Sequence, residues 1–285
     1  MFCTVSGKIS GDIMKTVKFI RYPGGKQRLL KFILPYLPSV NSIKGRFVEP
    51  FVGGGAVFFA LNPSSALLAD INPVLIDLYR GLRNHPSKVW EIFMQFPKTR
   101  LAYYKIRNSS GKLDLPARAA KTLYLNRTCF KGMWRENSRG QFNVGYGGQD
   151  RRWVINQESL IAVSKFLKKA ELKVNDFEET IESCDHNDFL FIDPPYLPGE
   201  RELIQNHYIY YRFTYDEHRR LATALKKASK RKVKWALTIS SHNDIIRLYN
   251  NNYSIPLLKG TGKRPGQMVR NSGEVLICNY REAPP

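Results

Sequence analysis

The chain has 285 residues and carries 45 basic against 24 acidic side chains, a formal charge of +21. This length suits one large α/β domain with an inserted subdomain, and the charge suits a polyanion, either nucleic acid or an anionic membrane surface. No apolar run approaches the roughly twenty residues of a membrane span, and the first residues lack a signal peptide's apolar core, so we expect a cytoplasmic protein. Its 4 cysteines and 5 histidines lack metal-ligand spacing, and no metal is expected.

The N-terminal half begins without pattern and then alternates between helix and strand signals. We expect residues 1–17 to form a flexible extension. Apolar residues at helical spacing predict a helix over 27–37, and short apolar runs predict strands at 47–48 and 66–69. Helices are expected near 73–82 and 87–96, the second one preceded by Pro86.

A run of three glycines, residues 53–55, separates the strand at 47–48 from the start of a helix. Glycines let the backbone approach a ligand without interference from a Cβ atom, and the N–H groups at the helix start point to the same place. Asp70 ends the next strand about twenty residues on, where an acid binds ribose hydroxyls in nucleotide-type sites. The segment lacks a triphosphate-loop Lys-Ser/Thr pair and a strict G-x-G-x-x-G. A ligand with ribose and no phosphate, such as S-adenosylmethionine, therefore fits best; the alternative is a tight structural turn.

The segment between residues 98 and 152 is basic, with interleaved aromatic side chains and few acids. Cations for phosphates, with flat rings and amides for bases, are typical of a nucleic-acid surface. Residues 137–144 predict a hairpin with Ser138, Arg139 and Gly140 in its turn, and its polar tip suits a DNA groove. The alternative, a solvated basic face over an aromatic core, is preferred only for residues 123–125, which fit a buried helix.

The α/β alternation then resumes. Strands are expected at 172–174, 189–192, 233–239 and 275–279, and helices near 156–169, 215–227 and 243–249. Strands separated by helices predict a mostly parallel sheet with helices on both faces. Ligands bind such sheets at the carboxyl ends of the strands, and these ends are followed by Gly53, Asp70, Asp176 and Asp193.

The strand at 189–192 runs directly into Asp193-Pro194-Pro195-Tyr196. The Asp193 carboxylate and the Pro194 carbonyl can each accept a hydrogen from an exocyclic amino group, and the Tyr196 ring can stack on a planar base. This combination suits methylation of an amino group on a base. The alternative is a strand exit at which the prolines stop the strand and the aspartate caps the next segment of the chain.

Taken in order, these motifs resemble the D12 class of Dam-like DNA adenine-N6 methyltransferases over residues 19–280. The similar segments are 21–26, 48–55, 69–72, 123–127, 137–144, 175–177 and 193–196. The resemblance implies an α/β, Rossmann-like S-adenosylmethionine-dependent methyltransferase fold with an inserted, mainly helical target-recognition subdomain that carries a β-hairpin. We expect residues 18–85 and 160–285 to form the catalytic and cofactor-binding domain, and residues 86–159 the subdomain.

The resemblance also implies a role for individual residues. Tyr22 and Lys26 would border the methionine end of S-adenosylmethionine, and the rest of its site would comprise Phe51, Gly53, Gly55, Asp70 for the ribose, Asp176 and Phe177 for the adenine, and Asp193. The catalytic residues would be Asp193, Pro194 and Tyr196. The residues that face DNA would be Arg21, Asn126, Arg127, Lys131, Arg135, Asn137, Arg139, Gln141 and Gln149.

The expected reaction moves a methyl group from S-adenosylmethionine to N6 of an adenine flipped out of double-stranded DNA. We expect a monomer that needs no protein partner. Relatives commonly methylate GATC, but this chain departs from their pattern at Lys131, Gly145 and Gln149, which touch base recognition and leave the target sequence open. The alternatives are cytosine-N4 methylation of DNA, adenine-N6 methylation of RNA, and a non-catalytic DNA-binding protein on a decayed methyltransferase fold.

Overall fold

The structure is a computed structural model that describes residues 19–22, 24–137, 140–148, 155–196, 213–240, 243–249 and 274–281. These residues contain a six-stranded sheet with the strand order β3-β2-β1-β4-β5-β6. Its strands are β1 (Phe47–Glu49), β2 (Ala66–Asp70), β3 (Ala170–Val174), β4 (Phe189–Ile192), β5 (Lys234–Ser240) and β6 (Glu274–Cys278). All pairs are parallel except β5 with β6, which confirms the mostly parallel sheet.

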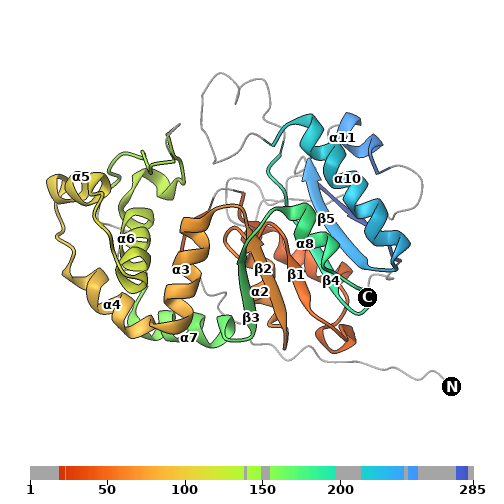
Figure 1. Cartoon of the computed structure of the whole chain (residues 1–285), viewed down its shortest axis with the longest axis horizontal. Coiled ribbons are helices and arrows are strands. Elements are labelled where there is room, and N and C mark those ends of the chain that lie inside the picture. The colour runs from red at the N-terminus through yellow and green to blue at the C-terminus, as the bar shows by residue number, and fades with distance from the viewer. Residues whose placement is uncertain are drawn as a thin grey trace.

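Helices cover both faces of this sheet (Figure 1). They are α1 (Leu30–Ile33), α2 (Ala56–Leu61), α3 (Pro73–Asn84), α4 (Pro86–Gln95), α5 (Arg100–Asn108), α6 (Leu115–Thr128), α7 (Gln157–Leu167), α8 (Phe177–Glu182), α10 (Tyr215–Lys230) and α11 (Asn243–Arg247). Within the described part, no helix combines the length and the apolar character that crossing a bilayer requires.

The helix expected over residues 27–37 is divided into shorter pieces. The 3-10 turns Lys26–Arg28 and Leu34–Tyr36 flank α1, and another 3-10 turn follows at Val40–Ser42. Pro35 lies at the start of the second turn and has no N–H with which to continue α-helical hydrogen bonding. The chain therefore tightens after α1 rather than extending it.

Side chains alternate across the sheet, so each strand contributes to two cores. In the first core, Phe47 and Leu68 lie among residues of α2, α3 and α6. In the second, Val48, Leu67 and Leu190 lie among residues of α8, α10 and α11. A sheet with both faces covered leaves its carboxyl edge as the place where a ligand can reach the strands.

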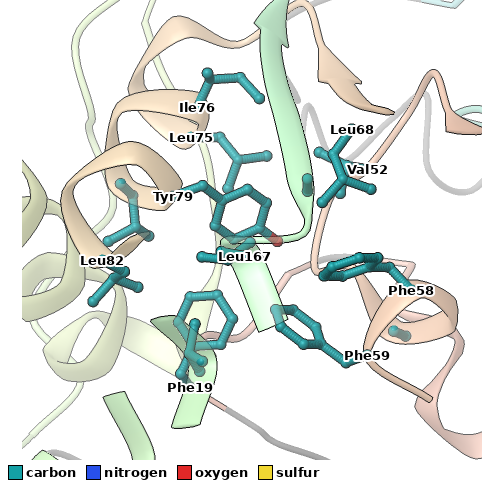
Figure 2. Packing of buried hydrophobic residues seen from close by; sticks show 14 of the residues in the cluster. Phe19, Val52, Phe58, Phe59, Leu68, Leu75, Ile76, Tyr79, Leu82 and Leu167 are labelled. Atoms are coloured by element: carbon teal, nitrogen blue, oxygen red, sulfur yellow. The ribbon is translucent and has the colours of Figure 1, made fainter. Parts of the chain in front are cut away.

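Tyr79 of α3 lies at the centre of the first core (Figure 2). Its ring centroid is 5.6 Å from that of Phe19, which in turn packs edge-on against Phe59 at 5.7 Å. Its hydroxyl donates a hydrogen bond of 2.6 Å to the carbonyl oxygen of Gly53. The packing of the core thus holds the glycine loop that follows β1.

Helices α4, α5 and α6 lie together at one end of the molecule (Figure 1). The first core continues from the sheet into this group through Leu82, Val89, Tyr103 and Leu123. Residues 123–125 are buried in α6, as predicted. The division into a catalytic domain and a subdomain at residues 86–159 stays a prediction, and the N-terminal extension at 1–17 lies outside the described residues.

The hairpin predicted after α6 is held by a single antiparallel bridge between Glu136 and Phe142, without regular strands in the described residues. The Asn137 N–H donates to the Gln141 carbonyl at 2.9 Å. Gly140 has a φ of 71°, in the left-handed region that favours glycine. The described residues of the segment thus form a short hairpin-like loop held by these contacts.

Candidate active site

A cavity of about 450 Å³ opens at the carboxyl edge of the sheet, between the segments that follow β1 and β4. The volume is typical of small-molecule sites. The cavity brings together all the residues predicted to bind the cofactor or to act in catalysis: Tyr22, Lys26, Phe51, Gly53, Gly55, Asp70, Asp176, Phe177, Asp193, Pro194 and Tyr196.

The glycine loop forms one wall of this cavity. Gly53 and Gly55 have φ values of 46° and 63°, which other residues rarely adopt. A Cβ atom on Gly53 would lie 3.1 Å from the ring of Tyr22, and one on Gly55 would lie 2.9 Å from the ring of Phe59. The absence of side chains here is therefore required by both conformation and close packing.

Asp70 stands beside the loop at the end of β2. Its Oδ2 accepts the N–H of Gly53 at 3.1 Å, and its Oδ1 accepts the N–H of Asn72 at 3.0 Å. Burial raises the pKa of the carboxyl to about 6, and these two N–H groups oppose the rise. A carboxylate has roughly four acceptor positions, so both oxygens can also bind ligand hydroxyls.

Two aromatic rings and an aspartate mark the opposite end of the cavity. The rings of Phe51 and Phe177 stack with centroids 5.3 Å apart. Asp176 caps α8 by accepting the N–H of Glu178 at 2.8 Å. Arg220 of α10 pairs with the Asp176 carboxylate and lies 4.2 Å from the centroid of the Phe177 ring. Sequence analysis missed Arg220, because on an amphipathic helix its charge is indistinguishable from those that face solvent.

The carboxylate of Asp193 is held through one of its two oxygens. Oδ1 is 2.8 Å from Lys26 Nζ and accepts the hydroxyl of Thr238 at 2.8 Å. No donor to Oδ2 occurs among the residues the structure describes, so that oxygen remains available to a ligand. Burial raises the pKa of Asp193, and Lys26 and Thr238 only partly offset this effect. Burial disfavours the charged form of Lys26, but Asp193 and Glu274 outweigh it and raise its pKa.

Glu274 places a second acid beside Asp193 and Lys26. Its Oε2 accepts the hydroxyl of Tyr196 at 2.9 Å and lies 3.5 Å from Lys26 Nζ. The same ammonium is 4.7 Å from the centroid of the Tyr196 ring. Sequence analysis missed Glu274, which opens β6 and does not follow a strand. An acid directly before an apolar strand was the only available signal.

The charge of the cavity is opposite to that of the whole chain. Among the described residues that line it, the acids Glu49, Asp70, Asp176, Asp193 and Glu217 face only two cations, Lys26 and Arg220. Burial and the neighbouring Asp193 raise the pKa of Glu49 well above its usual range. An acidic cleft attracts a cationic ligand and repels phosphates.

The structure gives two residues predicted to face DNA an interior position instead. Asn126 is fully buried, where its Oδ1 accepts the N–H of Arg21 at 2.9 Å and its Nδ2 donates to the Arg21 carbonyl at 2.7 Å. Arg127 is 5% exposed. Asn126 thus fixes the backbone of Arg21, and a role of Asn126 and Arg127 in facing DNA stays a prediction.

Four other described candidates lie in the segment after α6, whereas Arg21 lies before the first 3-10 turn and is half-buried. Lys131 is exposed, with its ammonium 5.1 Å from the ring centroid of half-exposed Phe130. Arg135 donates to Asn143 Oδ1 at 2.8 Å. The side chains of Asn137 and Gln141 are exposed and bond to each other at 3.1 Å. Two further candidates lie outside the described residues, namely Arg139 and Gln149.

A second cavity, of about 550 Å³, lies between the hairpin-like loop and α3, α5 and α6. Lys121 Nζ donates to the carbonyl and hydroxyl oxygens of Ser109 at 2.7 and 3.0 Å. Burial lowers its pKa. Arg118 pairs with Asp77 at 3.0 Å, but within the described part of the chain neither Lys121 nor Arg107 forms an ion pair. Two uncompensated cations thus line this cavity.

Comparison with known proteins identifies the family. Residues 22–261 match the D12 class N6 adenine-specific DNA methyltransferases. The chain is 30% identical to the Type II methyltransferase M1.LlaDCHI of Lactococcus lactis subsp. cremoris, over 92% of this chain and 95% of that protein. It is 32% identical to the Type II methyltransferase M.MjaIII of Methanocaldococcus jannaschii, over 94% and 100%. It is 33% identical to the DNA adenine methylase of Haemophilus influenzae, over 81% of each. The chain belongs to the D12 class of N6 adenine-specific DNA methyltransferases.

Proposed function

We propose that this DNA adenine-N6 methyltransferase takes its methyl group from S-adenosylmethionine, bound in the acidic cavity, and acts as a cytoplasmic monomer on double-stranded DNA. The observation that carries the proposal is the carboxylate of Asp193. Lys26 and Thr238 occupy its Oδ1 and leave Oδ2 for the amino group of a base.

The residues present fit this methyl donor. The glycine loop leaves room for a ligand, Asp70 offers acceptors for ribose hydroxyls, and Phe51 and Phe177 offer apolar faces for an adenine. When bound, S-adenosylmethionine supplies an electrophilic methyl group on a positively charged sulfur. An excess of carboxylates suits that charge and disfavours a dinucleotide or a triphosphate, whose phosphates are anionic.

The proposed chemistry needs no covalent bond to the protein. The lone pair of an adenine amino group is delocalised into the ring. Oδ2 of Asp193 and the carbonyl of Pro194 would accept its two hydrogens and so localise the lone pair on nitrogen, while the Tyr196 ring holds the flipped base. The amino nitrogen would bond to the methyl carbon as the S–C bond breaks, S-adenosylhomocysteine would leave with the electron pair of that bond, and the nitrogen would then lose one proton. Asp193, with its raised pKa, is placed to accept that proton.

The decisive experiment is to incubate the pure protein with S-adenosylmethionine and unmethylated genomic DNA and to map modified bases by single-molecule sequencing. We expect N6-methyladenine in one sequence motif. Methylation at GATC would mean that Gly145 and Gln149 differ from the family pattern without changing the target sequence. Methylation at another sequence would mean that these two differences alter specificity. No methyladenine from a folded protein that binds S-adenosylmethionine would contradict the proposal; N4-methylcytosine would establish the main alternative.

The proposed DNA surface follows the loop after α6 and includes Lys131, Arg135, Asn137 and Gln141. The second cavity extends it, because Lys121 and Arg107 lack carboxylate partners in the described part of the chain and a DNA phosphate would supply the missing charge. Contacts of this kind set affinity and its dependence on salt rather than the choice of base.

Replacing Lys121 with glutamine should reduce the slope of log Kd against log salt concentration by about 0.9, the contribution of one phosphate contact. We would measure the slope by fluorescence anisotropy with a duplex that contains the methylated motif. Lys165→Gln makes the same charge change and serves as a control. Lys165 is exposed on α7, a helix that lies away from the loop after α6 (Figure 1). Equal slopes for the two variants would show that Lys121 does not contact a DNA phosphate.

A further inference from the structure

Glu274 reaches the active site because of the direction of its strand. β6 runs antiparallel to β5, and Glu274, its first residue, pairs with Ser240, the last residue of β5. The parallel strands deliver their last residues to the carboxyl edge of the sheet, whereas β6 delivers its first. An acid is thereby placed beside the segment that follows β4, although 81 positions separate it from Asp193 in sequence.

One oxygen of Glu274 joins three segments of the chain. Oε2 accepts the Tyr196 hydroxyl at 2.9 Å and lies 3.5 Å from the ammonium of Lys26. Lys26 is also 2.8 Å from Asp193 Oδ1 and 3.0 Å from the carbonyl oxygen of Gly24. Glu274 therefore contacts both the aromatic ring proposed to hold the base and the cation that holds the catalytic carboxylate.

These contacts have two separate consequences. A tyrosine hydroxyl bonded to a carboxylate holds its ring at a fixed position, since hydrogen bonds to charged groups are stronger than those between neutral groups. Lys26 lies between two carboxylates, so its charge is shared between Asp193 and Glu274. The negative charge of Glu274 raises the pKa of Asp193, although burial is the larger cause of that rise. A less neutralised carboxylate accepts hydrogen bonds more strongly.

We propose that Glu274 is a positioning residue for methyl transfer, which fixes the Tyr196 ring against the target base and shares the Lys26 ammonium so that Asp193 remains a strong acceptor. This inference rests on the roles proposed above for Asp193 and Tyr196. It adds a residue from the antiparallel edge strand to a site otherwise built at the ends of parallel strands.

Two substitutions separate the consequences. Glu274→Gln keeps an oxygen for the Tyr196 hydroxyl and removes the charge. We expect a lower kcat, and an acid limb of the pH–rate profile displaced to lower pH, because Asp193 loses a neighbour that raises its pKa. Glu274→Ala also releases the ring, and we expect kcat to fall about tenfold, the effect of losing one charge-assisted hydrogen bond. KM for S-adenosylmethionine should stay within about twofold of wild type if only positioning is lost.

A double-mutant cycle with Tyr196→Phe tests whether Glu274 acts through the ring. In the Tyr196→Phe background the hydroxyl is already missing, so Glu274→Ala should cost clearly less than it does alone. Glu91→Gln on α4, an exposed acid remote from the cavity, controls for the change in net charge. Thermal unfolding and S-adenosylmethionine affinity are measured for each variant to exclude misfolding. If Glu274→Ala does not fold, the pH–rate profile of Glu274→Gln still tests whether Glu274 acts on Asp193.

The outcomes separate this inference from the proposed function. If wild-type protein methylates adenine while Glu274→Gln keeps wild-type kcat and pH profile, the inference is overturned and the proposed function stands. Full additivity in the double-mutant cycle would overturn the action through Tyr196. If wild-type protein makes no methyladenine, the proposed function and the positioning role of Glu274 are both contradicted.

Discussion

Replacing Asp193 with alanine should lower kcat for adenine methylation by about 10² to 10³, the usual cost of removing one group that binds the reacting centre in the transition state. The substitution removes the acceptor for the amino hydrogen and the proposed acceptor of the proton. Lys26 would keep Glu274 as a partner at 3.5 Å, so its buried charge would stay compensated and the fold should persist.

Asp193→Asn should be nearly as inactive as the alanine variant, for a reason specific to this site. Lys26 and Thr238 both donate to Oδ1, so they would hold the single amide oxygen of asparagine there. The amide NH₂ would then lie where Oδ2 lies now, a donor facing the amino group of the base. Single-turnover methylation assays at saturating S-adenosylmethionine would measure the loss. Asp216→Asn, an exposed position on α10, is the matched control, and near-wild-type activity of Asp193→Asn would contradict the assignment of Oδ2.

Replacing Asp70 with asparagine should weaken S-adenosylmethionine binding by about tenfold or more. The Asp70 carboxylate accepts the N–H groups of Gly53 and Asn72, and a ribose hydroxyl bonded to it would gain the strength of a hydrogen bond to a charge, about 1.5–3 kcal/mol. The amide of asparagine has one oxygen, so it leaves at least one of these N–H groups without its partner.

The affinity of wild-type protein should also depend on pH in a defined range. Asp70 has a pKa of about 6, so its carboxyl is ionised at pH 7 and becomes protonated as the pH falls through 6. Binding that requires the ionised form should weaken by on the order of tenfold for each pH unit below 6. Titration calorimetry between pH 5 and 7.5 would show this slope in wild type and a flatter one in Asp70→Asn. Equal slopes would assign the titration to another group.

The geometry of parallel strands predicted the places of Gly53, Asp70, Asp176 and Asp193, whereas Tyr22, Lys26, Phe51 and Phe177 were expected in the cavity only from the family resemblance. Asp70 and Asp193 directly follow buried apolar runs, and the carboxyl ends of parallel strands meet at one edge. The same reasoning could not find Glu274 or Thr238. Thr238 lies inside β5, and Glu274 belongs to an edge strand whose direction no local pattern records.

Helix α6 shows a second limit of prediction from sequence, which concerns buried polar residues. The buried helix at residues 123–125 follows from its apolar side chains, whereas Asn126 and Arg127, next in the chain, were predicted to face DNA because their segment resembles the target-recognition region of the family. Burial of a polar side chain depends on a partner distant in sequence, here the backbone of Arg21, 105 positions away. Neither periodicity nor residue type contains that information.

The pair of hydrogen bonds between Asn126 and Arg21 has a consequence for communication between the two substrates. Asn126 lies at the end of α6, directly before the proposed DNA surface, and Arg21 directly precedes Tyr22, which packs on the glycine loop. If DNA binding displaced the end of α6, these two amide contacts would connect that displacement to the wall of the cofactor cavity. Linkage requires this coupling to be reciprocal: if DNA strengthens the binding of S-adenosylmethionine by some factor, S-adenosylmethionine strengthens the binding of DNA by the same factor.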